Sequence, residues 1–161
     1  LYEFSTEDRF TIQLEDVQDI NATQKSKNGK ARCDIMLTLE NGVDKSTVAI
    51  ELKHFKKASK NSSSETITDN RFSIWCDLEN LENYKEVFSQ KNQELIGYEI
   101  LYTNNPNYAN PGSTSYVKIG HGIVMNPGEY ESNGRKVTLR NEYTFNWDIY
   151  PDDNCFLKIK V

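Results

Sequence analysis

Cysteine is scarce in this chain of 161 residues and is poorly placed for cross-linking. Cys33, Cys76 and Cys155 are widely spaced and odd in number, and no CxxC pair occurs. This pattern argues against a disulfide scaffold and against a zinc site. It is typical of a reducing compartment, so we expect a cytoplasmic protein.

Long hydrophobic runs are also missing. No apolar stretch approaches the ~20 residues that a membrane-spanning helix needs, so we expect no contact with a membrane. Hydrophobic residues make up only 37% of the chain, which predicts a small core and long polar loops. The chain has only two histidines and no matching nucleophile, which argues against a His-dependent hydrolase.

The charge balance and the length limit the class of protein further. With 19 basic and 24 acidic side chains, the formal charge is -5, which argues against non-specific coating of nucleic acid but permits a local basic face. The length suits a single domain over residues 1–161. The chain starts at Leu1 rather than Met, so we expect the N-terminus to be truncated.

Apolar spacing predicts helices over residues 5–20 and 72–90. The segment 57–70 is polar and Ser-rich, so we expect a loop that leads into the second helix. The apolar stripe of the second helix comprises Phe72, Trp75, Leu78, Leu81, Tyr84 and Phe88. Its solvent-facing side is expected to carry the acids Asp77, Glu79, Glu82 and Glu86. Strands are predicted over residues 20–26, 31–40, 46–53, 96–103, 116–125, 137–145 and 155–161.

The segment 31–57 is the most informative part of the sequence. It reads as two alternating strands around an Asn41-Gly42 turn signal. Asp34 lies in the first strand, while Glu51 and Lys53 lie in the second. Alternation places the three charged side chains on one face of the hairpin.

The register of the hairpin decides how close the two carboxylates come. If Glu40 pairs with Lys45, Asp34 lies directly opposite Glu51, with Cβ atoms ~5 Å apart. A tight two-residue loop would instead place Asp34 opposite Ala49, with Glu51 diagonal at ~7 Å. In both registers the carboxylates repel, so a compensating group is needed.

Three arrangements can offset this repulsion: a shared proton, pairing with Lys53 or Arg32, or a divalent cation. Magnesium typically takes one or two carboxylates and keeps several waters for a phosphate substrate. A lysine beside such an ion can orient or deprotonate an attacking water. The simplest alternative is a solvent-facing ladder of ion pairs on an edge hairpin.

Asp34, followed after sixteen intervening residues by Glu51-Leu52-Lys53, resembles the motif of the PD-(D/E)xK nuclease superfamily. The resemblance extends to the apolar context, "CDIML" and "VAIELK", although Cys33 replaces the proline of the family pattern. It implies an α/β fold: a restriction-endonuclease-like αβββαβ core with a mixed central sheet, here followed by a β-rich C-terminal extension.

The same resemblance implies roles for the residues. Asp34, Glu51 and the backbone carbonyl of Leu52 would bind Mg2+ or Mn2+, and Glu7 would approach that ion directly or through water. Lys53 would handle the nucleophilic water or stabilise the phosphate. The reaction would be phosphodiester hydrolysis of nucleic acid, with DNA as the expected substrate. Glu7 has a competing interpretation as a favourable charge at a helix start.

Basic residues around the hairpin suggest where a substrate would lie. The predicted contacts to nucleic acid are Lys56, Lys57, Lys60 and Arg32. An ordinary solvated loop explains the lysines equally well. Cleavage of two strands would favour a homodimer. The alternative function is a catalytically inactive nuclease-like module that binds nucleic acid or protein.

Overall fold

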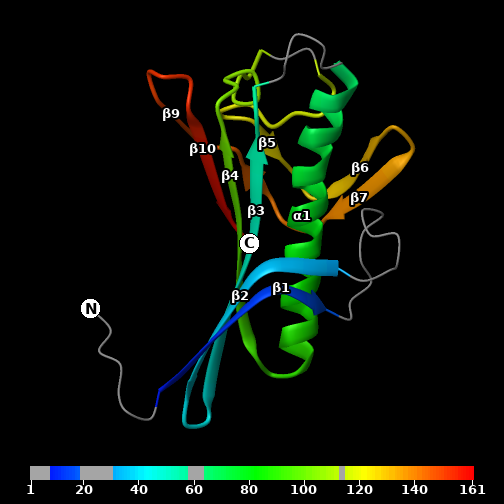
Figure 1. Ribbon diagram of the computed structural model, residues 1–161. Coiled ribbons are helices and arrows are strands. Elements are labelled where there is room, and N and C mark those ends of the chain that lie inside the picture. Colours follow the sequence, from blue (N-terminus) through cyan, green and yellow to red (C-terminus); the bar gives the residue numbers. More distant parts are fainter. Residues whose placement is uncertain (1–7, 19–30, 58–63, 113–114) are drawn as a thin grey trace.

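The computed structural model describes residues 8–18, 31–57, 64–112 and 115–161. They form an α/β fold in which a mixed six-stranded sheet, ordered β1-β2-β3-β4-β10-β9, packs against one long helix (Figure 1). The sheet strands are β1 (Arg9–Gln18), β2 (Ala31–Asn41), β3 (Asp44–Phe55), β4 (Glu94–Thr103), β9 (Trp147–Ile149) and β10 (Cys155–Lys160). Two short ribbons pair β5 (Val124–Met125) with β8 (Tyr143–Thr144), and β6 (Gly128–Ser132) with β7 (Arg135–Leu139).

The connections explain the mixed character of the sheet. Strands β1, β2 and β3 follow one another in antiparallel order. The helix α1 (Ser64–Gln90) then carries the chain across, so that β4 runs parallel to β3. Strand β10 closes on β4 in antiparallel order. The predicted strands 31–40, 46–53 and 96–103 are confirmed to within a few residues.

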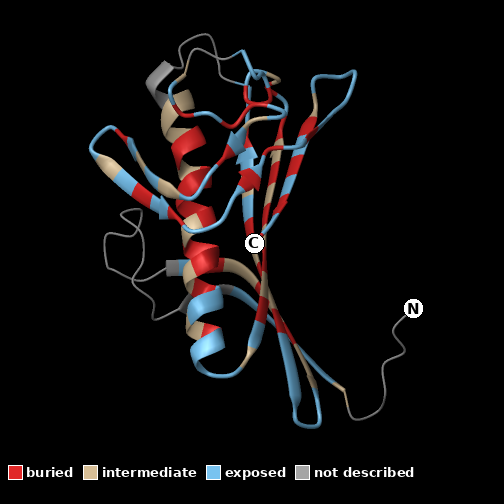
Figure 2. Cartoon of the chain, turned by 180° about the vertical axis from the view of Figure 1, so that it is seen from behind, coloured by how far each residue is buried: buried red, intermediate tan, exposed pale blue. Residues whose placement is uncertain are grey.

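Helix α1 supplies the core on one face of the sheet, and its buried side is continuous with the buried positions of the strands (Figure 2). The predicted apolar stripe is confirmed, because all of its members are buried. Gly97 allows the helix to approach β4 closely: a Cβ at this position would lie 3.2 Å from Leu81. In the described part of the chain, no helix is both long and apolar enough to cross a membrane.

The predicted helix over residues 5–20 is wrong where the structure describes this segment, because residues 9–18 form β1. Phe10, Ile12 and Leu14 alternate with polar residues, and they lie opposite apolar residues of β2. The helical spacing of Phe10 and Leu14 fits the same residues, but pairing with β2 decides the outcome. The predicted strand 20–26 lies outside the described residues.

Two further boundaries differ from the prediction. The segment 64–70, predicted as loop, is the first part of α1, since tertiary contacts extend the helix beyond its apolar stripe. The predicted strand 155–161 is confirmed as β10, whereas most of 116–125 is irregular and only Val124–Met125 is a strand. Segment 137–145 divides between β7 and β8.

Candidate functional site

The register of the hairpin is the one that brings the two carboxylates closest. Glu40 is the partner of Lys45 in the β2–β3 ladder, and their side chains form an ion pair of 2.9 Å. The turn lies at Gly42-Val43, one residue later than the Asn41-Gly42 signal suggested, with Gly42 in the left-handed region at φ +59°. Continuing this register places Asp34 opposite Glu51.

Strand β2 separates from β3 at this point. The β2–β3 ladder ends at Ile35 and Ile50, whereas β2 keeps pairing with β1 as far as Ala31. Figure 1 shows the bend, at which β2 turns away from the direction of β3. Asp34 therefore lies where the hairpin opens.

Side chains replace the lost ladder bonds at the bend. The backbone N–H of Leu52 donates to Asp34 Oδ2 at 2.8 Å, and the Cys33 thiol lies 3.6 Å from the carbonyl of Ile50. The Asp34 carboxylate is thus fixed beside the short segment that carries Glu51 and Lys53. Burial, followed by the negative charge of Glu51, raises the pKa of Cys33 to about 12, so this thiol remains neutral.

Lys53 reaches from β3 to the helix. Its Nζ lies 2.5 Å from Asp77 Oδ2, and the side chains of Lys53 and Asp77 are 16% and 1% exposed. The prediction that Asp77 lies on the solvent-facing side of α1 is therefore wrong. It is also wrong for Glu82, which is 3% exposed and binds the C-terminal region, whereas Glu86 is exposed as expected. A buried carboxylate on α1 is compensated by the lysine that faces it.

Glu51 is buried under the helix rather than lying in an open cleft. It is 3% exposed, and its neighbour across the parallel β3–β4 ladder is Glu99, which is 0% exposed. Neighbouring strands lie ~4.8 Å apart, so two carboxylates share one buried strip of the sheet. Tyr84 of α1 lies against Glu51: burial, followed by the charge of Glu51, raises the pKa of the tyrosine.

Glu99 and Asp77 are the residues that sequence reasoning missed. In β4 the buried positions alternate through Leu95, Gly97, Glu99 and Leu101, so the period-two pattern does place Glu99 on the core face. The sequence gives a weaker indication that Asp77 is buried, since this residue immediately precedes Leu78 of the apolar stripe. In both cases, only the register between elements shows which group each acid meets.

The chemistry of Asp34 and Glu51 fits a divalent cation in part. Asp34 uses Oδ2 for its bond to Leu52, so its second oxygen can bind a cation without breaking that bond. Within the described residues, no three His, Cys, Asp or Glu side chains surround a common metal position. An ion at Asp34 and Glu51 would need the Leu52 carbonyl, water and substrate oxygens to complete its coordination, as is common for magnesium.

The remaining predicted residues are only partly brought together. Arg32, Lys56 and Lys57 are exposed, and Lys57 Nζ lies 3.4 Å from Asp153 Oδ2. Glu7 and Lys60 lie outside the described residues. None of the protein-family models, curated proteins or solved structures compared with the chain matches it.

Proposed function

We propose that the protein is a magnesium-dependent nuclease that hydrolyses phosphodiester bonds of nucleic acid, with DNA as the expected substrate. The observation that carries the proposal is the hydrogen bond from the Leu52 N–H to Asp34 at the end of the β2–β3 ladder, because Leu52 lies between Glu51 and Lys53 in the chain. The order of elements supports it: three antiparallel strands, a crossover helix and a strand parallel to the third agree with the βββαβ part of a restriction-endonuclease-like core.

Each residue has a role in this proposal. Asp34, Glu51 and the Leu52 carbonyl would hold the cation, which would supply positive charge for the scissile phosphate and lower the pKa of a bound water. Lys53, whose side chain is 16% exposed, would donate from its ammonium to the phosphate or orient the attacking water. Asp77 positions that ammonium through the ion pair.

The ion pair also favours a second candidate function. An ammonium held 2.5 Å from a buried carboxylate is less available to a substrate than a free one. This arrangement supports a nuclease-like module that has lost catalysis and binds nucleic acid.

A cleavage assay separates the two functions. Wild type is incubated with Mg2+ and linear, circular and single-stranded DNA and RNA, in parallel with Lys53→Ala and with Lys45→Ala, a lysine in a surface ion pair of the same strand. We expect wild type and Lys45→Ala to cleave and Lys53→Ala to lose at least about 100-fold, since a positioned acid–base group contributes roughly 10²–10⁴ in rate.

Folding must be controlled in this assay, because Lys53→Ala leaves Asp77 buried without its cation. A Lys53→Met/Asp77→Leu double variant replaces both charges by apolar side chains of similar shape, and such replacements of a buried ion pair are often neutral for stability. If the folded double variant cleaves like wild type, Lys53 has no catalytic role. If wild type cleaves no substrate in the panel but binds one of them, the second function replaces the first.

A further inference from the structure

The outer face of the sheet, opposite α1, carries a row of aromatic rings near the end of β3. Ring centroids lie 5.1 Å apart for His54 and Tyr102, 4.9 Å for Tyr102 and Phe156, and 5.8 Å for Phe156 and Tyr150. The row crosses β3, β4 and β10 and reaches the residue after β9. We call these four residues the aromatic row.

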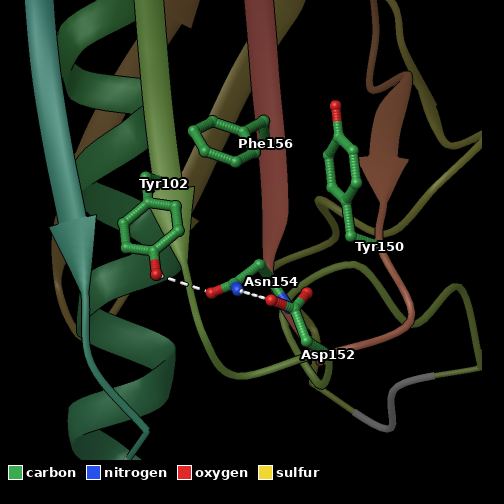
Figure 3. Close-up of a pocket in the computed structure, with 5 residues that line it drawn as sticks. All are labelled: Tyr102, Tyr150, Asp152, Asn154 and Phe156. Carbon is green, nitrogen blue, oxygen red and sulfur yellow. Dashed lines mark hydrogen bonds between the residues drawn. The ribbon is translucent and has the colours of Figure 1, made fainter.

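The aromatic row opens into a pocket of about 430 Å3, lined by Tyr102, Tyr150, Phe156, Asp152 and Asn154 (Figure 3). The rings of Tyr150 and Phe156 are exposed, at 50% and 42%. Exposed rings of this size are costly to leave in water, and their gathering in one pocket marks a binding surface.

The polar side of the pocket is built from a short chain of hydrogen bonds. The Tyr102 hydroxyl donates to Asn154 Oδ1 at 2.6 Å, and Asn154 Nδ2 donates to Asp152 Oδ2. These bonds engage both the oxygen and the nitrogen of the Asn154 side-chain amide, and they hold Asp152 at the edge of the pocket. An ionised carboxylate only accepts, so the pocket selects a flat ligand with N–H donors on its edge.

Lysines flank the aromatic row and can meet the phosphates of a ligand, whereas the charges at the pocket itself are acidic: Asp152 lines it, and Asp148 lies opposite Phe156 in the β9–β10 ladder. Phe156, Lys158 and Lys160 occupy the exposed face of β10, with successive Cα atoms of this set ~7 Å apart. Lys56 and Lys57 follow the end of β3 on the other side of the row. Asp153 offsets one of these charges by pairing with Lys57 at 3.4 Å.

We infer that the aromatic row binds single-stranded nucleic acid, with unpaired bases stacked on Tyr102, Tyr150 and Phe156 and the phosphates beside Lys158 and Lys160. Flat rings with N–H donors and attached phosphates are what nucleotides present, and an exposed base face requires a single strand. The choice of nucleic acid rests on the proposed function. The surface itself differs from the proposed cation site, because Glu51 points to the other face of β3, toward Tyr84 of α1, and Asp34 belongs to β2.

The test is fluorescence anisotropy with labelled single-stranded 12-mers of DNA and RNA, and with the corresponding duplex, in EDTA so that no cleavage occurs. We expect wild type to prefer the single strand and Tyr150→Ala to weaken its binding about fivefold or more, since base stacking on an aromatic ring has an effect of that size. Tyr116→Ala is the matched control, because Tyr116 is 57% exposed and lies outside the row.

A second variant tests the phosphate track and does not depend on the rings. Lys158→Ala should lower the slope of log affinity against log salt by about 0.7, the value for one contact to a single strand. The inference is overturned if wild type binds no single strand, if it binds duplex equally well, or if both variants bind as Tyr116→Ala does. Because EDTA removes catalysis, binding without any cleavage in Mg2+ would overturn the nuclease proposal alone.

Discussion

Lys53 and Asp77 form the ion pair whose loss should be most costly. Asp77→Ala leaves the Lys53 ammonium without its carboxylate partner. Breaking a buried ion pair in this way typically costs ~3–5 kcal/mol. We expect about 3 kcal/mol, the lower end of that range, because the Lys53 side chain keeps 16% exposure and can turn toward water. Urea denaturation measures the free energy of unfolding. The control is Glu129→Ala, which breaks the exposed Lys136–Glu129 pair and should cost less than about 1 kcal/mol; equal losses would contradict the account.

Cys33 gives a prediction for the pH dependence of stability. Its pKa is raised from 9.0 to about 12 in the folded state, chiefly by burial. The folded protein therefore holds this proton more tightly than the unfolded chain, so the contribution is complete below pH ~9 and is lost as the pH rises toward ~12. We expect the unfolding free energy of wild type to fall more steeply between about pH 8.5 and 10.5 than that of Cys33→Ala. Parallel curves in urea denaturation would exclude this role.

At the residue scale, the spacing of Asp34, Glu51 and Lys53 was sufficient to predict their neighbourhood, because the three residues belong to one hairpin whose register follows from local pairing. Glu99 and Asp77 come from other elements. Their proximity to Glu51 and Lys53 depends on how α1 and β4 pack, which the sequence does not encode locally.

At the element scale, several side chains of α1 bind the C-terminal region, and among them Glu82 is buried. Glu82 accepts hydrogen bonds from the backbone N–H groups of Arg140 and Asn141 and from the Tyr143 hydroxyl, at 2.8–3.0 Å. Burial of Tyr143, followed by its hydrogen bond to the Glu82 carboxylate, raises the pKa of that tyrosine. The Glu82 carboxylate thus accepts the hydrogen bonds that a neighbouring strand would otherwise accept from the backbone N–H groups of this turn.

Glu82→Ala should therefore weaken the attachment of the C-terminal ribbons. We expect a loss of about 3 kcal/mol, because hydrogen bonds to a charged group contribute roughly 1.5–3 kcal/mol each and the Tyr143 hydroxyl would remain buried without a partner for its proton. Urea denaturation is followed by near-ultraviolet circular dichroism. Glu86→Ala, one turn further along α1 and 57% exposed, is the control and should cost under about 1 kcal/mol. A similar cost for both variants would show that Glu82 is not an anchor.

The incorrect predictions also belong to this scale. Residues 9–18 satisfy a helical and an alternating pattern at once, and only the partner strand β2 distinguishes them. Their polarity predicts that the acids of α1 face solvent. Asp77 and Glu82 are nevertheless buried, because Lys53 and the 140–143 turn supply their partners.

At the scale of the whole molecule, the predicted α/β class and mixed sheet are confirmed, with β10 joining the sheet beside β4. The sheet has α1 on one face, and in the described part of the chain its other face carries the aromatic row. The two faces of β3 thus carry different groups: Glu51 and Lys53 point toward α1, while His54 points to the outer face. Under the two proposals made above, the cation site and the strand-binding surface would use opposite faces of this strand.

Calorimetric titration with Mn2+ tests the central claim, that Asp34 and Glu51 hold one divalent cation. Wild type is compared with Asp34→Asn and with Asp44→Asn, a control at the exposed tip of the same hairpin. We expect one binding site in wild type and in Asp44→Asn, and its loss in Asp34→Asn. Absence of binding in wild type, or unchanged binding in Asp34→Asn, would contradict it.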